Sequence, residues 1–582
     1  MTQNRPFLTL PPWLGPALAG LLLLLLPIGR PLTDGDTAYY ALIAQHMVET
    51  GDWMTLRYPG RDELVDKPPL TIWLIAASYL LFGFNEAAIR LWHVLMSIGT
   101  VAVVQATAGL FFSRAVASLA GWVLLTSCLF VYCAFVPQQD MPLTFFASAA
   151  FYGFARFLRG DGWRWTYLSW ASLALGLLAR GPQAVVFPLL AAGITVLAVV
   201  GWDLKPGARA AAGPGPFLRS PAVSPAAAVG HLVLGGLVFV AIGAPWFVHQ
   251  YLVHGWPIID LLLGAGQARF LQDTGRGPDV LRFWSYVPLL FVALLPWSGW
   301  ILPSLGHAWR GLRQPGHPLP HREPDASNAR TGLILFGAWF LVAFWLPFAI
   351  QWRVIRYLLP ALPPLAVLIA HAAETAGQRT YRAAAWLSML VAVPVSILVV
   401  AVYAVAFPEE QAVYVSFLRP FLTVLGIATA AFVILALSQR RRTALLGLIA
   451  GGWLAFALLF QSLAGYADKL LPAYGAVRAA SASWRRNASP ASPTACPAPA
   501  PASSAARPRL SSSSGLRSTV VSTRSTIAAT RSRRTFSSAC ASTPLMSIRS
   551  LSRWTSTPAS RVTRSSTFAF SATWASRSST RR

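Results

Sequence analysis

Residues 229–249 read VGHLVLGGLVFVAIGAPWFVH, an apolar run without a single Asp, Glu, Lys or Arg. A helix of about 20 apolar residues crosses a hydrocarbon core about 30 Å thick, so this run is predicted to span a membrane. Similar runs recur at residues 12–29, 91–112, 115–136, 142–158, 165–179, 182–200, 282–304, 332–350, 355–373, 383–407, 419–437 and 443–464. The sequence therefore predicts an all-α membrane protein with about 13 transmembrane helices.

The composition of the whole chain agrees with a membrane protein. Of its 582 residues, 55% are hydrophobic and 12% are charged, and the mean hydropathy is +0.53. A soluble protein of this size could not bury so much apolar surface. The four cysteines suggest neither a disulfide framework nor a zinc spacing. The first apolar run lacks a small-residue cleavage site, so we expect a retained helix rather than a signal peptide.

The distribution of charge predicts how the chain is threaded through the membrane. The shorter apolar run at residues 70–84 follows Pro68-Pro69, and we interpret it as an interfacial or partly inserted helix that does not change the side of the chain. With a cytoplasmic amino terminus, the cytoplasmic connections then contain most of the arginines. The opposite connections contain most of the acidic residues, which is the bias of the positive-inside rule.

Residues 485–582 differ in composition from the rest of the chain. They are rich in Ser, Thr, Arg, Ala and Pro, no Asp or Glu follows Asp468, and 17 arginines lie beyond residue 470. Such a segment has too little apolar content to offset its ordering entropy, so we expect disorder. One interpretation is an arginine-rich arm for RNA or anionic lipid. We favour translation of a GC-rich gene in the wrong frame, and we expect no nucleic-acid partner.

The predicted domain organisation follows from these segments. Residues 1–465 form the transmembrane domain, residues 466–484 begin a carboxy-terminal region, and residues 485–582 are the low-complexity tail. Function is therefore sought in the first of these, where polar residues stand next to predicted spans.

The connection after the first span is the most polar of the outer connections. It holds eleven polar or aromatic residues that point to a site: Asp34, Asp36, Tyr39, Tyr40, Asp52, Trp53, Arg57, Asp62, Glu63, Asp66 and Lys67. Dense polar groups beside a bilayer usually mark a functional site. Residues 37–50 have the pattern of an amphipathic interfacial helix. Asp36 stands where it could serve chemistry or only cap this helix.

Several short motifs, in their order along residues 10–465, resemble those of polyprenyl-phosphate-dependent glycosyltransferases, which include the aminoarabinose lipid A transferases and the protein O-mannosyltransferases. The first connection contributes Asp36-Thr37-Ala38-Tyr39-Tyr40-Ala41-Leu42-Ile43-Ala44, Gly51-Asp52-Trp53 and Lys67-Pro68-Pro69-Leu70. Later matches are Arg90-Leu91, Asp140-Met141-Pro142-Leu143, Arg180-Gly181-Pro182, Ala244-Pro245-Trp246, Pro296-Trp297 and Arg356-Tyr357-Leu358-Leu359-Pro360. No single motif is specific, but the ordered set is.

The resemblance implies a GT-C type bundle in the bacterial inner membrane with its active site facing the periplasm. It implies transfer of a sugar from an undecaprenyl-phosphate or similar donor to lipid A or to another lipid or glycan acceptor. Such enzymes need no nucleotide-sugar domain, and the chain contains no glycine-rich phosphate loop.

The chemistry of such a transfer suggests roles for the matching residues. The sugar phosphate leaves with negative charge, so cations stabilise it; Lys67, Arg90 and Arg180 are predicted to bind the donor phosphate. A carboxylate can accept the proton of the acceptor, and we assign this role to Asp36.

Asp140 is the second predicted catalytic carboxylate, with helix capping as its alternative role. Arg356 and Tyr357 are predicted to bind the donor phosphate or sugar, with membrane-interface anchoring as the alternative. Other polar residues of the outer connections are assigned to substrate binding: Asp34, Tyr40, Asp66 and Arg269.

Cofactor use and two rival functions stay open. No cofactor is certain and a divalent metal is possible, but residues 264–270 lack the histidine expected from the lipid A branch, and His249 with His254 is weak support for zinc. A transporter or flippase of lipid-linked sugars would also suit many helices. A non-catalytic scaffold or pseudoenzyme is the other alternative, since the tail replaces an expected outer domain.

Overall fold

The computed structural model describes residues 14–25, 27–29, 35–59, 67–203, 225–256, 286–313, 326–349, 354–406 and 411–470. The regular secondary structure of these residues is helical, which confirms the all-α prediction. The α-helices are α1 (Leu14–Leu25), α2 (Gly35–Thr50), α3 (Leu70–Phe82), α4 (Glu86–Phe111), α5 (Arg114–Leu125), α6 (Cys128–Phe135), α7 (Asp140–Leu158), α8 (Arg164–Arg180), α9 (Gln183–Asp203), α12 (Pro225–His254), α16 (Tyr286–Ala293), α17 (Ile301–Arg313), α18 (Ala326–Trp345), α19 (Leu362–Thr375), α20 (Gln378–Ala406), α21 (Gln411–Leu437) and α22 (Arg441–Leu470). Three 3-10 helices join them: η2 (Ser298–Trp300), η3 (Leu346–Ala349) and η4 (Ile355–Ala361).

Seven helices in the described ranges are long and apolar enough to cross a membrane. They cover residues 86–111, 183–201, 226–254, 328–345, 355–375, 419–437 and 441–461, and α5 with α6 adds an eighth that is bent by 64°. The chain is therefore a multi-pass membrane protein. The predicted number of thirteen spans is not confirmed by these helices, since α1 is short and the predicted span 282–304 is divided into α16, η2 and α17.

The break between α5 and α6 lies against the break in the span 282–304. The hydroxyl groups of Thr126 and Ser127 donate hydrogen bonds to backbone carbonyls of the preceding helical turn, with oxygen–oxygen distances of 2.6 and 2.5 Å. The indole of Trp297 donates to Thr126 Oγ1 at 2.8 Å, and the amide of Cys128 donates to the Leu295 carbonyl at 3.1 Å. Backbone groups released by one broken helix are thus satisfied by the other, as the interior of a membrane requires.

Helices α7 and α8 form an antiparallel hairpin. Gly153 allows them to approach closely, because a Cβ at this position would lie 2.5 Å from the Trp165 carbonyl oxygen. The short connection between Leu158 and Arg164 closes the hairpin at one end. The first residue of α7 and the last residue of α8 therefore lie at the other end.

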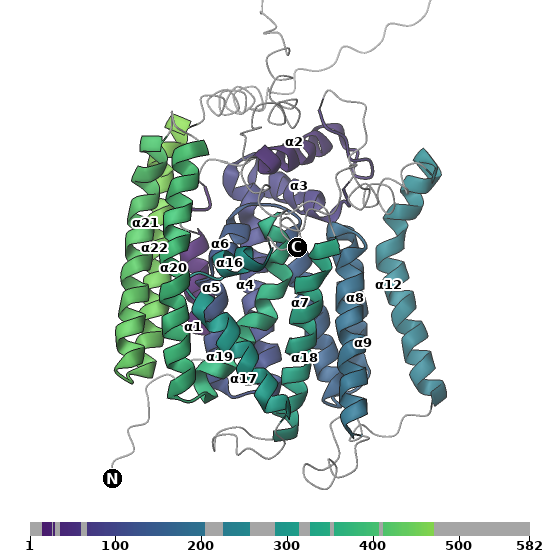
Figure 1. Ribbon diagram of the computed structural model, residues 1–582. Helices are drawn as coiled ribbons and strands as arrows, with labels where there is room; N and C mark the ends of the chain where they lie inside the picture. Colours follow the sequence, from purple (N-terminus) through teal and green to yellow (C-terminus); the bar gives the residue numbers. More distant parts are fainter. Residues whose placement is uncertain are drawn as a thin grey trace, which may run out of the picture. The chain divides into compact units, whose positions relative to one another are not determined.

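Two hydrophobic clusters hold the described helices together. The larger one runs through the bundle from α1 to α22. The smaller one joins α2 and α3 to the first turn of α4, with Leu178 of α8 and Trp246 of α12. In Figure 1, α2 and α3 lie across one end of the bundle, which agrees with these contacts. The helix predicted at residues 37–50 is confirmed as α2.

The segment after α2 is fastened to the same end of the bundle. The Met54 carbonyl accepts hydrogen bonds from Trp246 Nε1 at 2.9 Å and from Gln250 Nε2 at 2.6 Å. Trp73 Nε1 donates to the Trp53 carbonyl at 2.6 Å. These indole and amide donors fix the first connection against α3 and α12.

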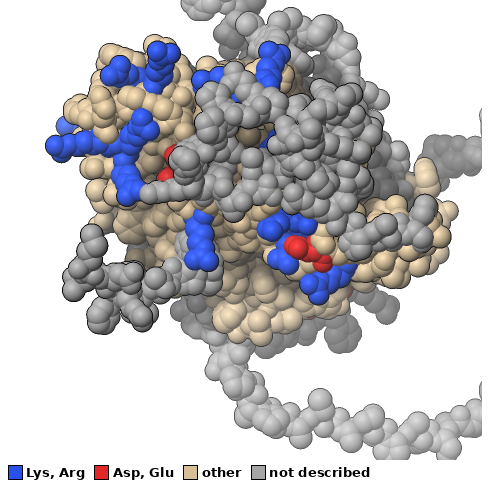
Figure 2. Space-filling model, turned by 90° about the horizontal axis from the view of Figure 1, so that it is seen from below, with Lys and Arg blue, Asp and Glu red and all other residues tan. Residues whose placement is uncertain are grey.

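The opposite end of the bundle carries the basic connections. Arg159, which follows α7, donates to the carbonyl of Leu110 at the end of α4, and Arg441 donates to Gln378 and to the Ala376 carbonyl between α19 and α20. Figure 2 shows this end from below, where Lys and Arg outnumber Asp and Glu among the described residues. Among the described residues, the basic connections predicted to share one side of the membrane therefore lie at one end.

Candidate functional site

The candidate site begins at Asp140, the first residue of α7. Proline is tolerated in the first turn of a helix, because amides there have no intrahelical partner, and Pro142 stands in that turn. The Asp140 side chain is almost fully buried, with an exposed fraction of 1% for the residue. A buried carboxylate requires a charged or hydrogen-bonding partner.

Arg180 supplies that partner from the last turn of α8. Its Nη1 lies 2.7 Å from Asp140 Oδ1. Gly181 ends the helix with φ of 87°, a left-handed conformation that favours glycine. The glycine turn allows the next helix, α9, to start immediately, so the arginine and the first residues of α9 border one space.

A second guanidinium approaches the same carboxylate from η4. Arg356 Nε lies 3.4 Å from Asp140 Oδ2. The neighbouring Tyr357 presents its ring to Arg180, with 4.9 Å between the guanidinium carbon and the ring centroid. The cluster therefore combines residues from α7, α8 and η4 that are far apart in the sequence.

The cluster of Asp140, Arg180 and Arg356 carries a net charge of about +1, since arginine stays protonated and the carboxylate is paired. The two arginine side chains are 11% and 24% exposed, against 2% for the aspartate. Positive charge therefore faces the accessible side, and the negative charge lies behind it. Such an arrangement favours an anion, and guanidinium groups match phosphate oxygens particularly well.

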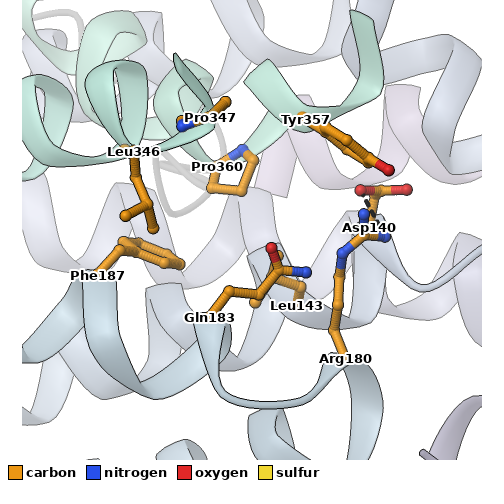
Figure 3. Close-up of a pocket in the computed structure, with 10 residues that line it drawn as sticks. Asp140, Leu143, Arg180, Gln183, Phe187, Leu346, Pro347, Tyr357 and Pro360 are labelled. Atoms are coloured by element: carbon orange, nitrogen blue, oxygen red, sulfur yellow. Dashed lines mark ion pairs between the residues drawn. The ribbon is translucent and has the colours of Figure 1, made fainter. Parts of the chain in front are cut away.

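A small pocket opens at this cluster. Its polar side is formed by Asp140, Arg180, Gln183 and Tyr357 (Figure 3). The other side is apolar and consists of Leu143, Phe187, Ala343, Leu346, Pro347 and Pro360. Ligand sites commonly combine apolar walls with a few orienting polar groups, and this pocket has that composition.

Arg90, predicted to bind phosphate, has a different environment from Arg180. Its exposed fraction is 2%. Its Nε donates to the Phe135 carbonyl at 3.2 Å, its Nη1 donates to the Ile28 carbonyl at 3.0 Å, and its guanidinium stands over the Phe135 ring at 4.2 Å. In the described structure it joins the ends of α1 and α6 and does not line the pocket.

The predicted residues of the first connection lie near the α2–α3 layer. Lys67 is half-buried and precedes Leu70, whose side chain packs against both hydrophobic clusters. Tyr40 is buried within the smaller cluster. Asp36 lies in the first turn of α2, which begins one residue earlier, at Gly35. Asp34, Asp66 and Arg269, and the side chain of Asp36, lie outside the described structure.

Metal ligands were also sought around the site. Within the described ranges, no group of three or more His, Cys, Asp and Glu side chains could hold a metal ion. Asp140 has two arginines as neighbours, which disfavour a cation there. The described residues therefore offer no cradle for a divalent metal.

Sequence reasoning missed five residues of the pocket: the apolar Ala343, Leu346 and Pro347, and the pair Gln183 and Phe187. Both follow the Arg180-Gly181-Pro182 motif, and both belong to α9. Their spacing of one helical turn puts them on the same face of α9. The signal was therefore in the sequence, but only the fold shows which face of α9 turns toward Asp140.

Comparison with known proteins gives a family match and relatives that align over part of their length. The family model described as dolichyl-phosphate-mannose-protein mannosyltransferase matches residues 66–206. An uncharacterized protein of Aquifex aeolicus (strain VF5) is 24% identical over 340 residues, which are 58% of each chain. Undecaprenyl phosphate-alpha-4-amino-4-deoxy-L-arabinose arabinosyl transferase 1 of Proteus mirabilis (strain HI4320) is 25% identical over 59% of this chain and 56% of its own. The matches thus span somewhat less than three fifths of these curated relatives.

Among solved structures, the chain is similar to ArnT from Cupriavidus metallidurans, crystallised with undecaprenyl phosphate. The TM-score is 0.59 at 20% sequence identity, over 78% of this chain and 77% of that one. The same TM-score is found for ArnT in the apo state. The predicted GT-C type fold is therefore confirmed, and the chain resembles transferases of the ArnT and protein-mannosyltransferase type in sequence and in fold.

Proposed function

We propose that this protein is a membrane glycosyltransferase that moves a sugar from a polyprenyl-phosphate donor, such as an undecaprenyl-phosphate sugar, to a lipid or glycan acceptor. The observation that carries the proposal is the Asp140–Arg180–Arg356 cluster, which presents a net positive charge to a pocket. The ArnT fold and the named transferase relatives support the same activity.

The arginines and Lys67 bind the donor phosphate in this proposal. In the transfer, the bond between the anomeric carbon and the phosphate oxygen breaks, and a bond from the acceptor oxygen to that carbon forms with inversion. Negative charge collects on the leaving lipid phosphate, where Arg180 and Arg356 stabilise it. Asp140 holds the two guanidinium groups in position through the ion pairs of 2.7 and 3.4 Å.

The proton of the acceptor needs a separate base, because Asp140 is engaged with both arginines. We assign this role to Asp36, which lies in the first turn of α2. The helix N-terminus favours the ionised carboxylate. Tyr40, Asp34, Asp66 and Arg269 remain proposed substrate-binding residues. Arg90, which the sequence predicts to bind phosphate, is instead assigned a structural role because of its observed contacts.

The site faces the periplasm of a bacterial inner membrane in this proposal. The basic connections lie at the end of the bundle opposite to α2 and α3 (Figures 1 and 2), and the positive-inside rule places such an end in the cytoplasm. The donor tail would lie between helices, with its phosphate at the α2–α3 end. Residues 1–465 form the transferase domain, residues 466–484 begin the carboxy-terminal region, and residues 485–582 remain a separate tail.

The test is transfer of radiolabelled sugar from synthetic undecaprenyl-phosphate sugars to a lipid A-containing membrane extract, with purified full-length protein in nanodiscs. Wild-type turnover that Asp36→Asn, Lys67→Ala and Arg180→Ala each reduce at low donor concentration, with the protein still folded, is the expected result. Gln461→Met, an exposed position on α22, is the control that keeps full turnover. Absence of both transfer and binding with every donor would overturn the proposal and favour a transporter or scaffold.

A further inference from the structure

Gln183 lies in the middle of the pocket, between the charged cluster and the apolar wall. Figure 3 shows it with Phe187 on one side and with Asp140 and Arg180 on the other. The side chain is half-buried. Its amide has no hydrogen-bond partner within the part of the chain that the structure describes. An amide carries two donors and an acceptor, and the half-buried amide of Gln183 is available to form these hydrogen bonds with a ligand that enters the pocket.

The backbone holds Gln183 rigidly beside Arg180. The Gly181 amide donates to the Leu177 carbonyl at 2.8 Å, and the Ala184 amide donates to the Gly181 carbonyl at 3.1 Å. The Pro182 carbonyl accepts from Val185 and Val186, each at 3.0 Å. These backbone hydrogen bonds fix the position of the Gln183 backbone relative to that of Arg180.

The amide of Gln183 suits a sugar better than a phosphate. It can pair with a hydroxyl, which both donates and accepts hydrogen bonds. A phosphate only accepts from such groups, so it gains nothing from the amide oxygen.

We propose that Gln183 is a specificity-determining residue that binds a hydroxyl or amino substituent of the sugar carried by the lipid phosphate. This inference rests on the proposed transferase function and names the part of the pocket that reads the sugar. The arginines bind the phosphate that all donors share, whereas Gln183 binds the sugar substituent that differs between donors. A site that hydrogen-bonds a substrate group discriminates against analogues that lack it.

The decisive variant is Gln183→Met, which keeps the length of the side chain and removes its hydrogen bonds. Binding is measured in nanodiscs by competition against tritiated undecaprenyl phosphate, with the bare lipid and with lipids that carry 4-amino-4-deoxy-arabinose, arabinose, mannose or glucose. Wild type is expected to bind one sugar-bearing lipid more tightly than the bare lipid. Gln183→Met should reduce this preference roughly tenfold, the value of about one hydrogen bond, and leave affinity for the bare lipid unchanged.

Three companion variants serve as comparisons for Gln183→Met. Arg180→Ala should weaken the binding of the bare and the sugar-bearing lipids by the same factor, because both lipids carry the phosphate. Gln183→Asn keeps the amide on a side chain that is one methylene shorter, and it should retain part of the preference for the sugar-bearing lipid. Gln461→Met should match wild type. Thermal unfolding of each variant separates a binding defect from a loss of fold.

The outcomes separate the inference from the function on which it rests. If wild type binds and transfers the sugar but Gln183→Met keeps the full preference, the inference is wrong and the transferase stands. An equal loss for bare and sugar-bearing lipids would also overturn it, since Gln183 would then serve the phosphate or the fold. If wild type binds no polyprenyl phosphate, the proposed function fails and the inference fails with it.

Discussion

Arg180 Nη1 lies 2.7 Å from Asp140 Oδ1 because the two residues occupy the open end of one helical hairpin. Asp140 begins α7 and Arg180 ends α8, so an antiparallel pair of helices of similar length necessarily brings them level. The carboxylate is nearly inaccessible and the guanidinium less so, at 2% and 11% exposure of the side chains. Asp140 thus contacts Arg180 on the side away from the pocket, and the remaining N–H groups of the arginine face the pocket.

Arg180→Ala is expected to reduce sugar transfer about 100-fold, because one preorganised donor to the leaving phosphate is lost. Arg180→Lys should restore only part of the activity, since an ammonium carries the charge without the two parallel hydrogen bonds. Steady-state transfer assays check both variants. Arg159→Ala, an exposed arginine at the other end of the hairpin, is the matched control, and an equal loss there would contradict a specific role for Arg180.

Asp140→Asn is expected to lower turnover at least tenfold without weakening the binding of bare undecaprenyl phosphate. The amide keeps the shape of the carboxylate, but the two guanidinium groups then repel each other and lose their alignment. The free energy of unfolding should fall by about 1–3 kcal/mol, the range for an unpaired buried polar group. Binding and chemical-denaturation measurements check this. A loss of lipid affinity as large as that of Arg180→Ala would indicate that Asp140 contacts the ligand itself.

Lys67→Ala and Asp36→Asn are expected to act on different kinetic constants. Loss of Lys67 should raise KM for the donor, with partial rescue by Lys67→Arg, because its role is to bind the phosphate. Loss of Asp36 should lower kcat about 100-fold with little change in KM, because a base acts in the transition state. Glu49→Gln, an exposed carboxylate on the same helix α2, should change neither constant. Matching effects of Asp36→Asn and Glu49→Gln would remove Asp36 from the mechanism.

Arg90→Met is expected to destabilise the fold while leaving the turnover of the folded fraction within about threefold of wild type. Its guanidinium donates to the carbonyls of Ile28 and Phe135, and bonds from a charged donor contribute about 1.5–3 kcal/mol each. The unfolding temperature in nanodiscs should fall, whereas the activity per folded molecule should change little. A normal unfolding temperature with lost activity would instead favour the phosphate-binding role predicted from the sequence.

Cysteine labelling is expected to place α2 and the α7–α8 connection on opposite sides of the membrane. In a variant without the four native cysteines, a membrane-impermeant maleimide should label Asp52→Cys in intact cells and Arg164→Cys only after lysis. Both positions are exposed. Labelling of both in intact cells would contradict the periplasmic orientation, as would labelling of Arg164→Cys alone.

The helices themselves were predictable because their signals are local. The span at residues 91–112 appears as α4, which begins earlier at Glu86 because Asn85 caps it through a bond from the Ala88 amide at 2.9 Å. The interfacial helix at residues 37–50 appears as α2, with its apolar side in the smaller cluster. Both depend on the spacing of apolar and capping residues within a few turns.

The breaks in the helices were not predictable from the apolar pattern. Residues 115–136 form one uninterrupted apolar run, yet the chain bends by 64° between α5 and α6. The bend is stabilised by Trp297, which donates to Thr126 from a distant part of the chain. A Thr-Ser pair within a helix permits a bend, but a partner for the released backbone groups decides it.

The sequence by itself determined that this chain spans a bilayer, where its long apolar segments lie, and which short motifs carry charge. Only the tertiary structure decided that Asp140, Arg180 and Arg356 meet in one cluster, that Arg90 is bound to backbone carbonyls, and that Gln183 enters the pocket. The physical reason is the separation along the chain between the residues on which each property depends. Transfer of a segment into lipid depends on its own apolar length, whereas a buried charge is stable only where a distant part of the chain brings its partner.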